Sequence, residues 1–316
     1  MTSTSHWLSL FPSRAKNLSF NIIRSSFGKT MAFSSKAVIS LTANEDRLKN
    51  LLLDAAASLN SSQVPQRVGQ DVDTRQPVIL RWAGGWVRDK LLGIDSHDVD
   101  VAINCMTGEQ FGLELRRFCT LPDIIKKHSI REEDLGSLHT IKANPEKSKH
   151  LATATCRVFG VDLDLVNLRK ETYSDHSRNP GVEFGTAVED ARRRDATVNA
   201  LFYNIHTNEV EDFTSGLSDL EAKVIRTPLE PFKTFTDDPL RVLRVIRFAS
   251  RLRFTIDPDA EQVIADTKVL ESLTIKISRE RVGIEVEKML KGNLRIRTRL
   301  PIPEREKKRG KRIKKQ

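Results

Sequence analysis

The spacing of apolar residues divides the chain into segments with different periods. Residues 45–59 place apolar side chains at helical spacing, which predicts an amphipathic helix, and residues 60–77 are typical of a polar linker. Between 78 and about 208, strand-like and helix-like patterns alternate. From residue 212 the strand signals fade, and helical periodicity dominates to residue 292. The pattern therefore predicts an α+β part followed by an all-α part.

Within the α+β part, the period and the flanking residues locate individual elements. Strands are predicted at 78–80, 98–103, 152–159 and 161–168, and helices at 86–92 and 108–118. Residues 142–150 are polar and predict a flexible hairpin tip. There is no internal repeat.

The charge of the chain is concentrated at its ends. The 316 residues carry a formal charge of +10. Residues 1–44 contain basic residues and no acid, and residues 293–316 are dense in Lys and Arg, whereas acids slightly outnumber bases between them. The high pI alone therefore does not indicate a nucleic-acid partner. The basic run at 293–316 predicts a disordered tail.

The N-terminal composition predicts an organelle address. Residues 1–44 are Ser-rich, acid-free and amphipathic, as transit peptides are, and the alternative is a disordered tail without an address. This predicts a mitochondrial or plastid protein. A second start at Met31 would allow a cytosolic or nuclear form. Three scattered cysteines argue against a zinc site or a disulfide framework, and no apolar run is long enough to cross a membrane.

Two aspartates one residue apart form the first candidate site. On a strand, Asp98 and Asp100 leave the same face, where their carboxylates repel each other. Mg²⁺ removes such repulsion, and it is often bound by one or two carboxylates together with substrate phosphates. Gly84 and Gly85 would let backbone amides approach a phosphate, and Arg88 would add charge-assisted hydrogen bonds. The alternative is a solvated acidic face after an ordinary tight turn.

A second strand carries a similar pair of acids. Asp162 and Asp164 alternate with apolar residues, and Asp164 is the candidate third carboxylate of the site. Three carboxylates would allow two metal ions, one for the attacking hydroxyl and one for the leaving phosphate. The alternative is that both acids only face water.

Six segments, taken in order, resemble class II tRNA nucleotidyltransferases, the CCA-adding enzymes, whose head is shared with bacterial poly(A) polymerases. The segments are GGWVRD with DVD (84–100), DLDLVNLRKETY (162–173), EDARRRDATVNALFYN (189–204), EDFTSGLSDL with IRTP (211–228), DDPLRVLRVIRF (237–248) and SRERVGIEVEKML (278–290). The resemblance covers residues 78–292. It implies a polymerase-β-like nucleotidyltransferase head with a mixed sheet over 78–210 and an incomplete helical neck over 211–292.

The resemblance also implies roles for single residues. Asp98 and Asp100 would hold the catalytic metals. The residues implied to bind the nucleotide are Gly84, Gly85, Arg88, Arg194, Asn199, Asp238, Arg241, Arg244 and Arg247. Taken without the resemblance, a helix that carries Arg194 and Asn199 would be a surface salt-bridge face. Asp238 before Pro239 would be a helix cap, and the arginines every three residues would be a solvated or RNA-facing fan.

Asp238 and Arg241 are implied to act as an amino-acid template for the incoming base. Aspartate only accepts hydrogen bonds and arginine only donates them. Cytosine and adenine both present an amino donor beside a ring acceptor, whereas uracil and guanine present the reverse and leave buried groups mispaired. A site built on hydrogen bonds can reject such mismatches by about 10⁴-fold. The pair thus accounts for the choice of C and A, but not for their order.

The implied function is template-independent, Mg²⁺-dependent addition of CCA to tRNA 3′ ends from CTP and ATP. Two alternatives stay open, a poly(A) polymerase on the same head and an RNA-binding form with little activity. The second follows because family members continue past the last matching segment into domains that grip tRNA. We interpret 293–316 as an alternative C-terminus of a shortened form. No sequence feature indicates an oligomeric state.

Overall fold

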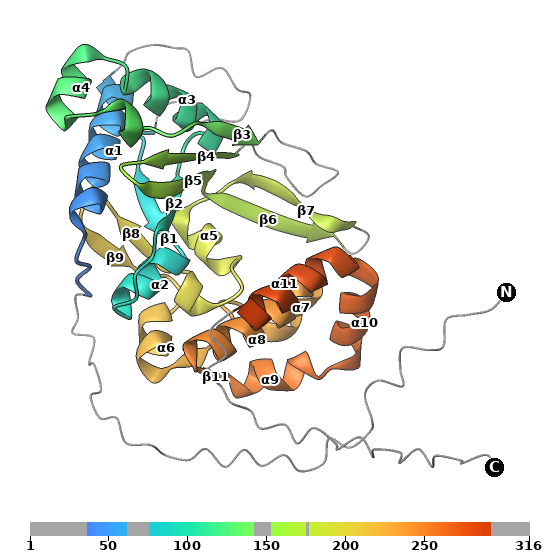
Figure 1. Cartoon of the computed structure of the whole chain (residues 1–316). Helices are drawn as coiled ribbons and strands as arrows, with labels where there is room; N and C mark the ends of the chain where they lie inside the picture. Colours follow the sequence, from blue (N-terminus) through green and yellow to red (C-terminus); the bar gives the residue numbers. More distant parts are fainter. Residues whose placement is uncertain (1–36, 62–75, 142–152, 175–176, 292–316) are drawn as a thin grey trace, which may run out of the picture. The chain divides into compact units, whose positions relative to one another are not determined.

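The computed structural model describes residues 37–61, 76–141, 153–174 and 177–291. A sheet with covering helices lies beside a group of helices formed by the last third of these residues (Figure 1). The predicted hairpin tip, the basic tail, and most of the transit peptide and linker lie outside the described residues. No helix in the described part is long and apolar enough to cross a membrane.

A seven-stranded mixed sheet forms the centre of the head. Its order is β3 (His139–Ile141), β4 (Thr153–Val158), β5 (Val161–Asn167), β2 (Asp98–Ile103), β1 (Leu80–Ala83), β8 (Phe202–Asn204) and β9 (Glu209–Glu211). Among these described strands β2 and β5 pair in parallel, and the other neighbours pair antiparallel. The parallel pair sets Asp100 directly opposite Asp164, so the two acid-bearing strands are neighbours.

Short helices and a separate hairpin surround the sheet. They are α1 (Ala43–Ser61), α2 (Gly85–Leu91), α3 (Gly108–Phe118), α4 (Pro122–His128), α5 (Ala187–Arg192), the 3₁₀ turns η2 (Glu132–Asp134) and η4 (Thr197–Asn199), and the hairpin β6 (Arg169–Ser174) with β7 (Ser177–Phe184). The prediction of an amphipathic helix at 45–59 is confirmed. Its buried positions, Leu48, Leu51, Leu52, Ala55 and Ala56, recur at helical spacing and face the core.

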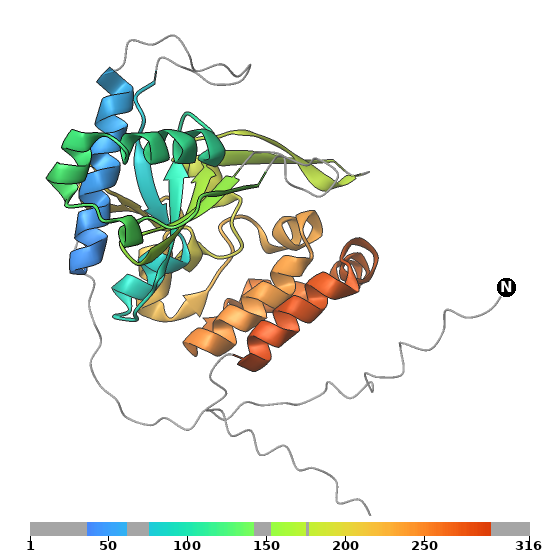
Figure 2. The same ribbon diagram turned by 45° about the horizontal axis from the view of Figure 1, so that its top comes forward.

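The second half is helical, as its periodicity predicts. It contains α6 (Gly216–Ala222), α7 (Pro231–Asp237), α8 (Leu240–Leu252), α9 (Pro258–Ile264), α10 (Thr267–Lys276) and α11 (Arg279–Lys291), with the short parallel pair β10 (Val224–Ile225) and β11 (Thr255–Ile256). Figure 2 shows α8 (orange) beside α11 (red-orange). Val245 and Phe248 of α8 belong to the same hydrophobic cluster as Trp82 of the sheet. One core therefore joins the head to the helices.

The first strand is shifted from its predicted position. We expected it at 78–80, but β1 begins at Leu80 and continues to Ala83, paired on both sides with β2 and β8. The backbone amides of Val78 and Ile79 donate instead to the side chains of Asn60 and Asn104. Side-chain hydrogen bonds thus replace strand pairing before Leu80.

Candidate active site

A cavity of about 560 Å³ is lined jointly by the head and by α8. Nine of the twelve predicted site residues line it: Gly84, Gly85, Arg88, Asp100, Arg194, Asn199, Asp238, Arg241 and Arg244. Nine arginine or lysine side chains and five carboxylates belong to the full lining, which leaves a formal charge of +4. A cavity with this charge suits a polyanion such as a nucleoside triphosphate.

Gly84 stands at the turn between β1 and α2, where a side chain would not fit. Its φ of 69° and ψ of −127° belong to a region that is almost restricted to glycine. A Cβ atom there would lie 2.8 Å from Nη1 of Arg194 and 3.4 Å from a carboxylate oxygen of Asp100. The amide of Gly84 donates to the carbonyl of Leu201 at 3.0 Å, so it is committed to the fold. The Gly84 amide is therefore already paired within the fold, and the missing side chain allows Arg194 and Asp100 to pack close to the turn.

Arg88 is held almost rigidly inside the cavity wall. It is only 3% exposed, and its Nε donates to Asp89 at 2.8 Å while Nη1 donates to the side-chain oxygen of Asn199. Asn199 in turn donates to Asp195 at 3.1 Å. Burial lowers the pKa of Arg88, and the adjacent Asp89 opposes that shift. The guanidinium is thus fixed in place before any ligand arrives.

Arg194 and Asn199 do not share a helix face, contrary to the alternative derived from sequence alone. Arg194 follows the end of α5, and Asn199 is buried on η4. Arg194 pairs with Asp190 at 2.9 Å and donates to the backbone carbonyl of Asn199 at 3.1 Å. Burial alone would raise the pKa of Asp190, but Arg194 and Arg193 bring it below its usual value. These contacts aim Arg194 at Asp100 and Gly84.

The three predicted carboxylates lie on neighbouring strands but are not equally buried. Asp98 is exposed at the start of β2, Asp100 is half-buried, and Asp164 faces Asp100 from β5. Burial raises the pKa of Asp100 to about 6, and Asp164 and Asp98 add to that rise against the effect of Arg194. The pKa of Asp164 is also raised, first by burial and then by Asp98 and Asp162.

A bound cation would reduce the repulsion between the carboxylates of Asp98, Asp100 and Asp164. Asp100 lines the cavity, whereas Asp98 and Asp164 do not belong to its lining. In the part of the chain that the structure describes, no three His, Cys, Asp or Glu side chains gather into a metal cluster. Two carboxylates completed by substrate phosphates are a recurrent ligand set for Mg²⁺, so the donors present fit that ion.

Asp238 and Arg241 line the same cavity from the start of α8. The N-cap of α8 is Pro239, not Asp238, but Oδ1 of Asp238 accepts from the amide of Leu240, the first residue of the helix, at 3.2 Å. Arg241 is 8% exposed, and its Nη1 donates to the carbonyl of Thr234 at 3.5 Å. The hydrogen bond from Leu240 to Asp238 holds one oxygen of the predicted base template in a defined place.

The arginines of α8 do not form a solvated fan. Arg241, Arg244 and Arg251 pair with Glu171, Asp195 and Asp89, three acids from separate segments of the head. Arg247 lies outside the cavity lining, and its Nε donates to Glu285 of α11 at 2.7 Å. Arg247 therefore contributes to a contact between helices and does not itself line the cavity.

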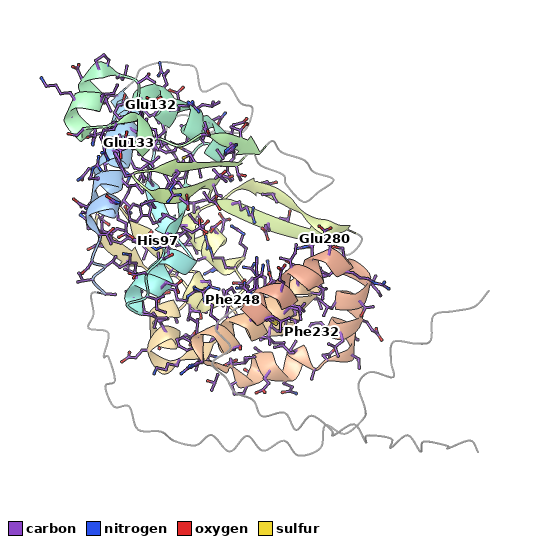
Figure 3. All side chains as sticks on the ribbon, viewed as in Figure 1. His97, Glu132, Glu133, Phe232, Phe248 and Glu280 are labelled. Carbon is purple, nitrogen blue, oxygen red and sulfur yellow. The ribbon has the colours of Figure 1, made fainter. Side chains whose placement is uncertain are left out.

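Phe248 connects these cations. It lies where α8 faces the head (Figure 3), and the guanidinium carbons of Arg247, Arg244 and Arg88 lie 4.3, 5.6 and 5.6 Å from its ring centroid. Such cation–π contacts are weakly attractive and hold the three guanidinium groups near the Phe248 ring. Sequence reasoning missed Phe248, Glu171 and Asp195. All three lie inside matching segments, but the arginines that Glu171 and Asp195 hold on α8 are remote from them in sequence, so spacing alone could not indicate these contacts.

The chain is similar in sequence to known nucleotidyltransferases. Residues 80–226 match the family model described as the Poly A polymerase head domain. The chain is 59% identical over 261 residues to Nucleotidyltransferase lcsQ of Purpureocillium lilacinum, over 83% of this chain and 42% of that protein. It is 50% identical over 276 residues to the mitochondrial CCA tRNA nucleotidyltransferase of Saccharomyces cerevisiae, over 86% of this chain and 48% of that one.

The fold has the same relatives. The CCA-adding enzyme of Bacillus stearothermophilus in complex with CTP matches with a TM-score of 0.55 at 25% identity, over 80% of this chain and 50% of that chain. The chain therefore carries a Poly A polymerase head domain over residues 80–226 and is similar to CCA tRNA nucleotidyltransferases over most of its own length. It spans about half the length of the curated relatives it matches.

Proposed function

We propose that the protein adds CCA to tRNA 3′ ends, using CTP and ATP and no nucleic-acid template. One observation carries the proposal: a single positively charged cavity is lined by Arg88, Arg194 and Asp100 of the head together with Asp238 and Arg241 from the start of α8. The first set suits a triphosphate and the second suits a base. The mitochondrial CCA enzyme among the relatives supports the same reaction for this chain.

The proposed reaction is an in-line nucleotidyl transfer. The 3′-hydroxyl of tRNA attacks the α-phosphate of the bound nucleotide, and pyrophosphate leaves. Arg88 and Arg194 stabilise the negative charge that develops on the phosphates, and they need no rearrangement because their partners already hold them. Asp238 accepts from the amino group of the base and Arg241 donates to its ring acceptor.

Nucleotidyltransferases of this family generally use a divalent metal ion. We propose Mg²⁺, held by Asp98 and Asp100 together with substrate phosphates. When bound, it supplies positive charge at the reacting phosphate and at the attacking hydroxyl. Asp164 lies opposite Asp100 on the neighbouring strand β5, and its negative charge also favours a cation there.

Extension of a tRNA that lacks CCA, tested with each nucleotide separately and with CTP plus ATP, decides the reaction. The proposal requires two C residues from CTP alone and a terminal A only after them. Long tails of A from ATP alone would instead establish a poly(A) polymerase. No extension by this chain, together with retained tRNA binding, would establish an RNA-binding form.

Two variants separate the proposed roles. Asp98→Ala should abolish extension with both nucleotides, because loss of the metal does not depend on the base. Asp238→Ala should leave some transfer but blur the choice between CTP and UTP. Equal loss of all incorporation in both variants would contradict this division of roles.

We also propose that residues 1–44 direct the protein to the mitochondrion, as their composition and the mitochondrial relatives suggest. A fluorescent fusion that starts at Met1 should reach mitochondria, and one that starts at Met31 should remain outside. Identical distributions of the two fusions would contradict an address within the first 30 residues.

A further inference from the structure

Glu171 brings three arginines together at the border between the head and the helices. It lies on β6, its side chain is 6% exposed, and it lines the cavity. Oε1 lies 3.1 Å from Arg169 Nε and accepts from Arg193 Nη1 at 3.1 Å. Oε2 accepts from Nη2 of Arg241 at 3.4 Å. A single carboxylate thus joins two cations of the head to the first arginine of α8.

We propose that Glu171 is a positioning residue, which holds the guanidinium of Arg241 in the orientation needed to read the incoming base. The proposal rests on the proposed function of Arg241. An arginine side chain has many rotamers, and fixing one of them costs side-chain entropy. A base template works only if its donors point in a fixed direction, so Arg241 needs a rigid partner beside the base site.

Glu171 is suited to be that partner because it is itself fixed. Strand β6 pairs with β7, where Glu171 stands opposite Val182. Arg193, which holds Oε1, is in turn anchored on Asp190 at 2.5 Å. Through Glu171, the hairpin restrains Nη2 of Arg241 relative to the head. The carbonyl of Thr234 on α7 accepts from the other terminal nitrogen, Nη1. The two acceptors together define the plane of the guanidinium.

The chemistry of the pair predicts the effect of removing its charge. A hydrogen bond to a charged group contributes roughly twice as much as a neutral one. Glu171→Gln keeps the shape of the side chain but leaves three arginines around a neutral amide. Arg241 would then sample other rotamers, and the binding preference for CTP over UTP should fall about tenfold. Affinity for inorganic pyrophosphate should not fall, because Arg88 and Arg194 keep their own partners and the cavity loses a negative charge.

Calorimetric titration of the full chain with CTP, ATP, UTP, GTP and pyrophosphate tests the proposal. The matched control is Glu183→Gln, which removes one negative charge from an exposed position on the same hairpin. Glu171→Asp keeps the charge and shortens the reach, so its preference should lie between those of the wild type and Glu171→Gln. If Glu171→Gln does not fold, the nucleotide preference of Glu171→Asp tests the proposal instead. An unchanged CTP preference in the folded Glu171 variants would overturn the proposal.

A double-mutant cycle distinguishes positioning from general support of the fold. In an Arg241→Gln background, Glu171→Gln should cause no further loss of preference, because Glu171 acts through Arg241. Additive losses would overturn the proposal.

Nuclear magnetic resonance of arginine side chains gives an answer that does not depend on the proposed function. Glu171→Gln should shift and broaden the guanidinium signals assigned by Arg241→Lys, and Glu183→Gln should leave them in place. Unchanged Arg241 signals would refute the restraint itself. A wild type without any preference among the nucleotides would refute the proposed function while the restraint still stands.

Discussion

Replacing Gly84 by alanine tests whether the turn above Asp100 is built for close packing. At φ 69° and ψ −127° a residue with a Cβ is strained by about 1–3 kcal/mol. The new Cβ would also stand 2.8 Å from Arg194 Nη1, which donates to the carbonyl of Asn199 at 3.1 Å. Displacing that donor costs about 1 kcal/mol more. We therefore expect Gly84→Ala to lower the free energy of unfolding by about 2–4 kcal/mol.

Gly93→Ala is the matched control for this variant. Gly93 has the same φ of 69°, but an added Cβ there would meet nothing within 4 Å. It should lose only the backbone strain, about 1–2 kcal/mol. Urea unfolding with an unchanged m value measures both losses. Titration with CTP should reveal weaker binding for Gly84→Ala alone, because that substitution moves Arg194. Equal losses of stability and equal CTP affinities in the two variants would refute the packing argument.

Two further predictions concern residues outside the cavity lining. Leu80 donates its amide to Nε2 of His206 at 3.1 Å, and burial, then Arg81, lowers the pKa of His206 below 6.5. Because the folded state binds this proton less readily than the unfolded state, stability should be complete above about pH 6.5 and decline below it. Unfolding measured from about pH 8 to about pH 5 should show that decline, and His206→Gln should flatten it; an equal slope in the variant would exclude His206 as its source. Arg247→Met should destabilise the fold by up to about 3 kcal/mol, since Glu285 loses its 2.7 Å partner, yet leave CTP affinity unchanged. A fall in CTP affinity at unchanged stability would instead place Arg247 in the nucleotide site.

The acid-bearing strands and the helical second half could be predicted from sequence, because each depends on a local period. Alternation at Asp98–Ile103 was enough to set two carboxylates on one face, and the structure has that strand with the same bounds. The parallel pairing with β5 could not be derived from the period, since strand order depends on contacts between segments remote in sequence. The start of β1 was misjudged for a similar reason, because Asn60 and Asn104 hold Val78 and Ile79 away from the ladder.

Among the site residues too, those that depend on local sequence could be predicted, and those that depend on remote contacts could not. Gly84, Arg88 and Asp100 belong to one short segment, and their convergence was predictable from it. The partners of the α8 arginines were not, because an arginine every three residues is equally consistent with a surface that faces water. Arg247 illustrates the point: it has the same spacing as Arg241 and Arg244, yet it pairs with Glu285 of α11 and does not line the cavity.

The three ion pairs between α8 and the head also determine how the two can be joined. Arg241, Arg244 and Arg251 reach acids on three different segments, and the helix advances by about 100° per residue. Turning α8 by a single residue would break all three pairs at once and leave Glu171, Asp195 and Asp89 buried without these partners. Only one rotation and position of α8 against the head therefore pairs all three acids. If the sheet forms first, any misaligned packing of α8 against it leaves buried carboxylates unpaired and is therefore unstable relative to the native arrangement.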